Sequence, residues 1–175
     1  MRAAKEKRTS FKVLNQQEAE TLECIAERIF PATDTPGAVE IGAVHYIDIA
    51  LAGDYAALLS LYRQSLRALD RHARTRFGKA FHALGGESQD AVLVAFESGS
   101  VPGYKKAAEF FETVRYHVMQ GIFCEPHYGG NKDMMGWRVV GFPGQQLGYS
   151  VPYINERVDL EPVAINPDEI EKKTS

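Results

Sequence analysis

Apolar residues that return every three or four positions constrain the fold of this chain more than any other feature. A helix-start pattern, Asn15 with Glu18 three positions later, leads into the first such stripe. Residues 55–77 keep this spacing for about six turns at 3.6 residues per turn. Convincing strand alternation is nearly absent, so we expect an all-α bundle of five or six helices. The segments with helical spacing are 15–30, 38–52 with a break allowed at Gly42, 55–77, 88–97 and 103–123.

The two ends of the chain lack this spacing. Residues 1–14 are charged and polar, and we expect a flexible N-terminal arm there. The helical domain, with the glycine-rich loop that follows its last helix, is expected over residues 15–145. Residues 146–175 contain Pro152, Pro162 and Pro167 and predict an extended C-terminal tail. Such a tail either stays free or lies along another surface.

Bulk composition excludes several classes of protein. The net charge of −3 and the pI of about 6.0 favour neither nucleic acid nor an anionic membrane as a partner. No apolar run of about eighteen residues occurs, so no direct membrane insertion is expected. The basic start of the chain is not followed by the apolar core of a signal peptide. Cys24 and Cys124 can form a disulfide or two buried thiols, and the thiols are favoured.

Five arginines fill the polar side of segment 55–77. The simplest interpretation is that this helix face is solvated. The more specific interpretation is that it forms salt bridges with an acidic partner. These residues are Arg63, Arg67, Arg71, Arg74 and Arg76.

No catalytic pattern stands out in the sequence. Cys124, Glu125 and His127 offer three metal ligands, but the second pair of a structural zinc site is missing. Phosphate-loop, dinucleotide, c-type haem and serine-elbow motifs are absent. His117 is interpreted as a packed histidine bound to a backbone carbonyl. We therefore expect no catalytic, cofactor-binding or metal site in this chain. The alternative is a stand-alone ligand-binding protein or metal-dependent enzyme with a pocket around His117, His127 and Trp137.

Residues 128–144 combine five of the fifteen glycines with the only tryptophan. Such glycine density allows positive φ angles or close backbone approach. Aromatic, Met and Arg side chains dominate the hot spots of protein interfaces. A protein interface is favoured, and a lid on the chain's own helices and a small-molecule site remain as alternatives. The expected interface residues are Tyr128, Gly129, Gly130, Asn131, Met134, Trp137, Arg138, Phe142, Pro143 and Tyr149.

Two blocks between residues 116 and 144 closely resemble the signature of the gluconate 2-dehydrogenase subunit 3 family. Residues 116–131 read YHVMQGIFCEPHYGGN, and residues 136–144 read GWRVVGFPG. Upstream, residues 29–38 read IFPATDTPGA and are similar to the exit of that family's first helix. Together the resemblance covers about residues 11–145.

The resemblance implies a function and a set of partners. Family members are small subunits of membrane-associated or periplasmic sugar and sugar-acid dehydrogenases, which oxidise a CH–OH group. The implied catalytic partner is a large FAD-binding flavoprotein of the glucose–methanol–choline (GMC) oxidoreductase type. In many such complexes a cytochrome c subunit with haem c carries the electrons onward. The small subunit itself would be non-catalytic, bind no cofactor, stabilise the flavoprotein and help its export to the periplasm. Many members carry a twin-arginine signal, which Lys7-Arg8 does not match, so a cytoplasmic location stays open.

Overall fold

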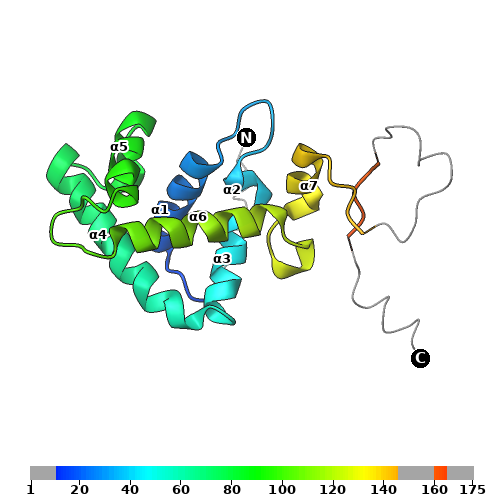
Figure 1. Ribbon diagram of the computed structural model, residues 1–175, viewed down its shortest axis with the longest axis horizontal. Helices are drawn as coiled ribbons and strands as arrows, with labels where there is room; N and C mark the ends of the chain where they lie inside the picture. Colours follow the sequence, from blue (N-terminus) through cyan, green and yellow to red (C-terminus); the bar gives the residue numbers. More distant parts are fainter. Residues whose placement is uncertain (1–10, 146–159, 165–175) are drawn as a thin grey trace, which may run out of the picture.

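The computed structural model describes residues 11–145 and 160–164, and within these ranges the chain is helical, with one isolated bridge as its only β pairing (Figure 1). The all-α prediction is confirmed. The elements are α1 (Gln16–Ile29), α2 (Ala38–Ile41), α3 (Ala43–Ala52), η1 (Ala56–Leu58), α4 (Leu59–Phe77), η2 (Phe81–Ala83), α5 (Gly86–Glu97), α6 (Ala107–Phe123), η3 (Pro126–Tyr128), η4 (Lys132–Met134) and α7 (Met135–Val140), where η marks a 3-10 turn.

The described ranges hold more α-helices than the five or six that the sequence predicts, seven in all. Gly42 divides segment 38–52 into α2 and α3, because it takes a left-handed conformation with φ of 87°. The other addition is α7, which lies inside the predicted loop. A six-residue helix is too short to show a period of 3.6 in its sequence.

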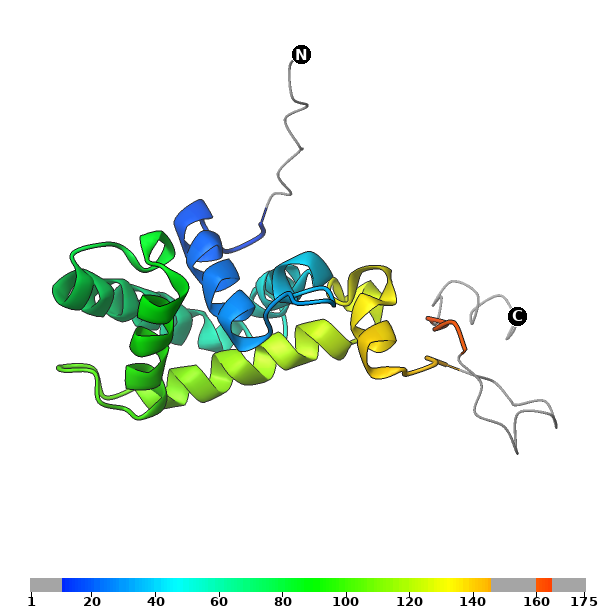
Figure 2. The same cartoon turned by 90° about the horizontal axis from the view of Figure 1, so that it is seen from above.

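Helix α6 runs along the length of the molecule and contacts each of the other α-helices (Figures 1 and 2). Its inner stripe, which includes Phe110, Val114, Val118 and Ile122, is buried. Burying one such side chain stabilises the fold by about 1.5–3 kcal/mol. Helices α4 and α5 pack near the start of α6, and α7 packs at its end (Figure 2).

Helix α1 begins at the predicted capping box. The Asn15 side chain accepts a hydrogen bond from the Glu18 amide at 2.9 Å, and the Glu18 carboxylate accepts one from the Asn15 amide at 3.0 Å. Both backbone donors would otherwise lack a partner at the start of the helix.

Residues 11–14, the last part of the expected flexible arm, are held against α3. The buried carboxylate of Asp48 accepts hydrogen bonds from the amides of Lys12, Val13 and Leu14, the last two at 3.0 Å. Leu14 is buried, and Phe11 stacks on His45 with ring centroids 5.1 Å apart. Residues 1–10 lie outside the described residues.

Five residues of the predicted tail return to the end of the helical domain. Gly144 and Val163 form a parallel bridge, and the Gln145 amide donates to the Val163 carbonyl at 2.8 Å. Arg138 on α7 pairs with Glu161 at 3.3 Å. The rest of the tail, residues 146–159 and 165–175, lies outside the described residues.

Among the described residues, no single helix is long and apolar enough to cross a membrane. Residues Ala43–Ala52 and Ala56–Phe77 meet the length and composition test only as a pair, which is bent by 99°.

The Asp48 anchor makes a testable prediction. Asp48→Ala leaves three backbone donors without their acceptor, so the free energy of unfolding should fall by about 2–4 kcal/mol. Urea denaturation measures the loss. Asp54→Ala is the control, because Asp54 is exposed and has no hydrogen bond within residues 11–145. Equal stability of the two variants would contradict the anchoring role.

Candidate functional site

Asn131 fixes the loop that follows α6. It is fully buried and takes a left-handed conformation with φ of 43°. Its amide donates to the Gly121 carbonyl at 2.7 Å, and its side-chain nitrogen donates to the Cys124 carbonyl at 2.9 Å. Its side-chain oxygen accepts from the Gly136 amide at 2.9 Å. Asn131 thus joins the end of α6 to the start of α7.

Trp137 completes this closure of the helix end. The indole nitrogen donates to the Phe123 carbonyl at 2.8 Å, and only 4% of the residue is exposed. The last carbonyls of a helix lack partners within the helix, so Trp137 and Asn131 both act as caps for α6. Phe142 meets the Trp137 ring edge to face at 5.1 Å.

Close backbone approach explains two of the glycines in the loop. A Cβ atom at Gly130 would lie 2.2 Å from the Gly121 carbonyl oxygen. A Cβ atom at Gly136 would lie 2.0 Å from the Ile122 carbonyl oxygen. Neither distance is sterically allowed, so only glycine lets the loop and α7 rest directly on α6.

The predicted interface residues divide into a buried and an accessible set. Gly130, Asn131 and Trp137 lie inside the fold and shape the surface from beneath. The exposed members are Tyr128, Arg138 and Phe142, while Gly129, Met134 and Pro143 are half-buried and Tyr149 lies outside the described residues.

Sequence reasoning missed two exposed apolar side chains nearby. Val140 at the end of α7 is 58% exposed, and Val163 of the returning segment is 50% exposed. They join Tyr128 and Phe142 at what we call the α7 end, residues 128–144 and 160–164. Large apolar side chains that remain exposed on a fixed support are typical of interaction surfaces.

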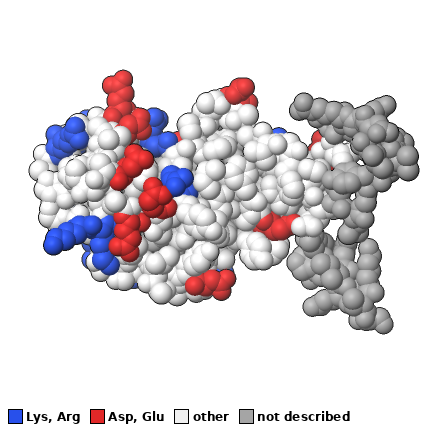
Figure 3. Space-filling model, in the orientation of Figure 1, with Lys and Arg blue, Asp and Glu red and all other residues white. Residues whose placement is uncertain are grey.

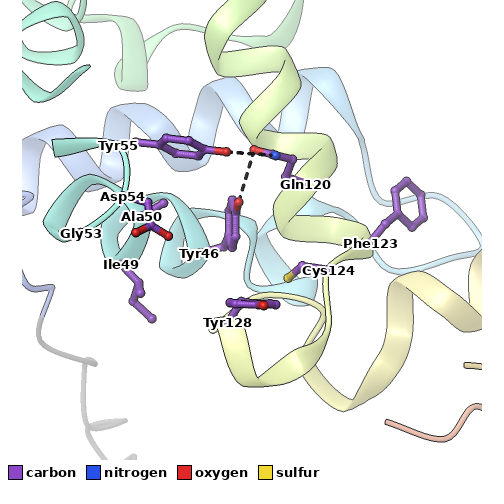
Figure 4. Close-up of a pocket in the computed structure, with 10 residues that line it drawn as sticks. All are labelled: Tyr46, Ile49, Ala50, Gly53, Asp54, Tyr55, Gln120, Phe123, Cys124 and Tyr128. Atoms are coloured by element: carbon purple, nitrogen blue, oxygen red, sulfur yellow. Dashed lines mark hydrogen bonds between the residues drawn. The ribbon is translucent and has the colours of Figure 1, made fainter. Parts of the chain in front are cut away.

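A cavity of about 590 Å³ opens beside Tyr128, between α3, α6 and η3 (Figure 4). Figure 4 shows Gln120 between two phenols: Tyr46 donates to its side-chain oxygen at 3.3 Å, and its nitrogen donates to the Tyr55 hydroxyl at 3.3 Å. The cavity is lined by Tyr46, Ile49, Ala50, Gly53, Asp54, Tyr55, Gln120, Phe123, Cys124 and Tyr128.

Two titratable groups of this cavity, Tyr46 and Cys124, have a raised pKa. Burial, with smaller contributions from neighbouring phenols, raises the pKa of Tyr46 to about 12. Burial also raises the pKa of the Cys124 thiol, although the Gly130 amide opposes that shift. A protonated thiol is a poor nucleophile and a poor metal ligand. Both cysteines are free thiols, in line with the favoured interpretation. Asp54 is the only charged residue type in the lining.

The structure does not bring His117, His127 and Trp137 into one pocket, so that part of the alternative prediction is wrong. His117 lies in the core, where its Nδ1 meets the Tyr62 hydroxyl at 2.8 Å and its ring stacks on Tyr55 at 4.6 Å. Its partner is a phenol and not the backbone carbonyl that the sequence suggested. His127 is exposed. None of the three lines the cavity beside Tyr128.

Within residues 11–145 and 160–164, no group of three His, Cys, Asp or Glu side chains could hold a metal ion.

Asn131 should be required for the folded loop. Asn131→Ala removes a buried donor and a buried acceptor and also disfavours the left-handed backbone, so about 2–4 kcal/mol of stability should be lost. The control is Lys132→Ala at an exposed neighbouring position. Thermal and urea denaturation of the isolated chain measure both variants. Equal stability of Asn131→Ala and Lys132→Ala would contradict the prediction, because the Asn131 hydrogen bonds would then not stabilise the fold.

Burial of His117 should make stability depend on pH. Desolvation lowers the pKa of His117 in the fold, while an unfolded histidine protonates near pH 6.5. The unfolded state then binds more protons, so stability is lost as the pH falls below about 6.5. His117→Asn should flatten this dependence in urea titrations between about pH 7.5 and pH 5.5. Exposed His127→Asn should keep the wild-type slope, and an unchanged slope in His117→Asn would contradict the assignment.

Comparison with known proteins identifies the family of this chain. The model of the family described as gluconate 2-dehydrogenase subunit 3 matches residues 16–144, from the first turn of α1 to the bridge after α7. No curated protein and no solved structure gives a match. The match spans most of the chain and includes the helix-capping residues Asn131 and Trp137. The chain therefore belongs to the gluconate 2-dehydrogenase subunit 3 family, whose name denotes an accessory subunit of a multi-subunit dehydrogenase.

Proposed function

We propose that this chain is the non-catalytic small subunit of an FAD-dependent sugar or sugar-acid dehydrogenase. Its role is to stabilise a large GMC-type flavoprotein and to accompany that protein during export. The observation that carries the proposal is the α7 end, where Tyr128, Val140 and Phe142 stay exposed on a loop that buried residues hold rigid. A preorganised apolar surface loses little conformational entropy when a partner binds.

The proposal assigns the redox groups to other chains. FAD belongs to the flavoprotein, which oxidises the CH–OH group of the substrate. Where a cytochrome c subunit is present, its haem c takes the electrons onward. The assembled complex would work in the periplasm. The small subunit contributes shape and contact area, and its cavity groups Tyr46 and Cys124 remain protonated at neutral pH.

A second observation fits a partner at this end. Both carboxylate oxygens of Glu125 are buried and have no hydrogen-bond partner in the described part of the chain. A buried carboxylate without a donor is unfavourable, and such groups normally find one. Glu125 stands between Cys124 and η3, next to the cavity wall. Because both oxygens are enclosed, a donor from the flavoprotein would reach them only if the segment around Glu125 moves on assembly.

The cavity beside Tyr128 favours one rival function, a ligand-binding subunit. Its volume and its mix of aromatic walls with several polar groups suit a small neutral molecule. The two functions differ in what the isolated chain does. A ligand-binding subunit retains a ligand when purified alone, whereas a bracing subunit gains its function only in the complex.

Val140 and Val94 provide a matched test of the α7 end. Each is exposed, at 58% and 59%, and each lies near the C-terminus of its helix, α7 or α5. Val140→Asp should weaken assembly with the flavoprotein about tenfold or more, because a buried interface does not accept an unpaired carboxylate. Val94→Asp should assemble like the wild type. Affinity is measured by titration of the purified subunits, and melting temperatures show that both variants are folded.

Flavin absorbance adds the decisive control. The complex should carry flavin, and the isolated chain should carry none. Flavin that co-purifies with the isolated chain would contradict the proposal. A complex that the small subunit leaves once the flavoprotein has folded would favour a transient chaperone, and gel filtration of the mature enzyme distinguishes this from a permanent subunit.

A further inference from the structure

The arginine side of α4 forms one wall of a second cleft, at the opposite end of the molecule from α7. Arg63, Arg67, Arg71 and Arg74 recur about every four residues and so share one face of the helix. Helix α1 supplies the other wall, and the cleft measures about 510 Å³. It is lined by Asn15, Gln17, Glu18, Thr21, Arg63, Leu66, Arg67, Asp70, Arg71, Arg74 and Thr75.

The two carboxylates of the cleft are already engaged. Glu18 accepts from the Asn15 amide at 3.0 Å and lies 3.5 Å from Arg63. Asp70 accepts from Arg74 at 2.8 Å and from the Phe81 amide at 3.0 Å. Neither carboxylate reaches the remaining two arginines of the cleft.

Arg67 and Arg71 are the unpaired cations of this cleft. Both are exposed, and neither side chain has a hydrogen bond or ion pair within residues 11–145 and 160–164. Their guanidinium groups project from adjacent turns of α4. Four arginines against two carboxylates leave the cleft with a charge of +2, although the whole chain carries −3. Figure 3 shows that charged side chains of both signs gather toward the α4 and α5 end on the face in view.

We propose that the cleft between α1 and α4 is a second docking surface, which binds a carboxylate-bearing segment of the partner protein. The inference rests on the proposed function, because that partner is the flavoprotein. Arginine presents a planar fork that pairs bidentately with a carboxylate, and two forks one turn apart fit two acidic side chains of one segment. Leu66 is only 5% exposed and the Thr75 hydroxyl donates to the Arg71 carbonyl at 2.9 Å, so the two arginines are the charged groups of the cleft that remain available to such a segment.

The shape of the cleft favours an acidic peptide over other anions. A membrane surface or a nucleic acid duplex attracts a broad basic face. Here the two unpaired cations lie inside a concave site whose other members include Glu18 and Asp70. A narrow segment can reach the arginines and avoid these carboxylates.

Charge reversal tests the proposal in the complete chain. The variant Arg67→Glu/Arg71→Glu is compared with Lys105→Glu/Lys106→Glu, which changes the net charge equally at exposed residues before α6. The affinity for the flavoprotein is measured at about 50 mM and about 500 mM salt. The arginine variant should bind about tenfold or more weakly at low salt and should lose most of the salt dependence. The lysine variant should behave like the wild type, and Arg67→Lys/Arg71→Lys should keep part of the affinity.

The outcomes separate a failure of the proposed function from a failure of the docking inference. If the wild-type chain forms no complex, the proposed function and this inference both fail. If the wild type binds and the arginine variant binds equally well, this inference alone is overturned. Equal losses in the arginine and lysine variants would also overturn it, because bulk charge would then explain the effect. Binding of the wild-type chain to anionic lipid vesicles, lost in the arginine variant while the complex persists, would reassign the cleft to a membrane surface. Melting temperatures check that the variants are folded.

Discussion

The structure depends on one contact, in which the loop after α6 rests its backbone directly on the end of that helix. A side chain at Gly130 or Gly136 would collide with the carbonyl oxygens of the last turn. Because the backbone approaches so closely, the side chains of Asn131 and Trp137 reach carbonyls at the helix end that have no partner within the helix, and they donate hydrogen bonds to them. The glycines and the two polar side chains therefore act together. Because α6 touches every other α-helix, closing its end also fixes the position of α7.

This construction gives the molecule two ends with different chemistry. At the α7 end, buried polar contacts support a surface on which exposed apolar side chains lie among charged ones, with Arg138 held by Glu161. At the other end, α4 turns a row of arginines toward α1, and two of them are unpaired within the described residues. Apolar contact supplies affinity, whereas charge complementarity supplies orientation and a fast encounter. Under the proposed function, contact at both ends would fix the small subunit in one orientation on its partner.

Much of the fold follows from local sequence patterns. The capping box at Asn15 and the break at Gly42 are both local signals, and each is found where it was predicted. The role of Asp48 could not be predicted, because its partners lie 34 to 36 residues earlier and reach it only through tertiary packing. The Tyr62–His117 pair, 55 residues apart, is unpredictable for the same reason.

The candidate site, too, could be predicted only as far as local sequence determines it. Aromatic and glycine content located residues 128–144 as the region of interest, but composition does not say which side chains face inward. Trp137 is the residue with the strongest interface statistics, and the structure uses it as a helix cap. Val140 and Val163 carry no such statistical signal, and they are exposed because α7 and the returning segment present them. Their interface role, like that of the other predicted residues, is a prediction that assembly experiments must decide.

Amide hydrogen exchange of the small subunit, free and bound to the flavoprotein, tests the central claim most directly. In the free chain, the amides of Asn131 and Gly136 should already exchange slowly, because both are hydrogen-bonded and buried. On assembly, new protection should appear at the amides around Tyr128 and from Val140 to Phe142. Unchanged exchange at the α7 end of a complex that demonstrably forms would contradict the account.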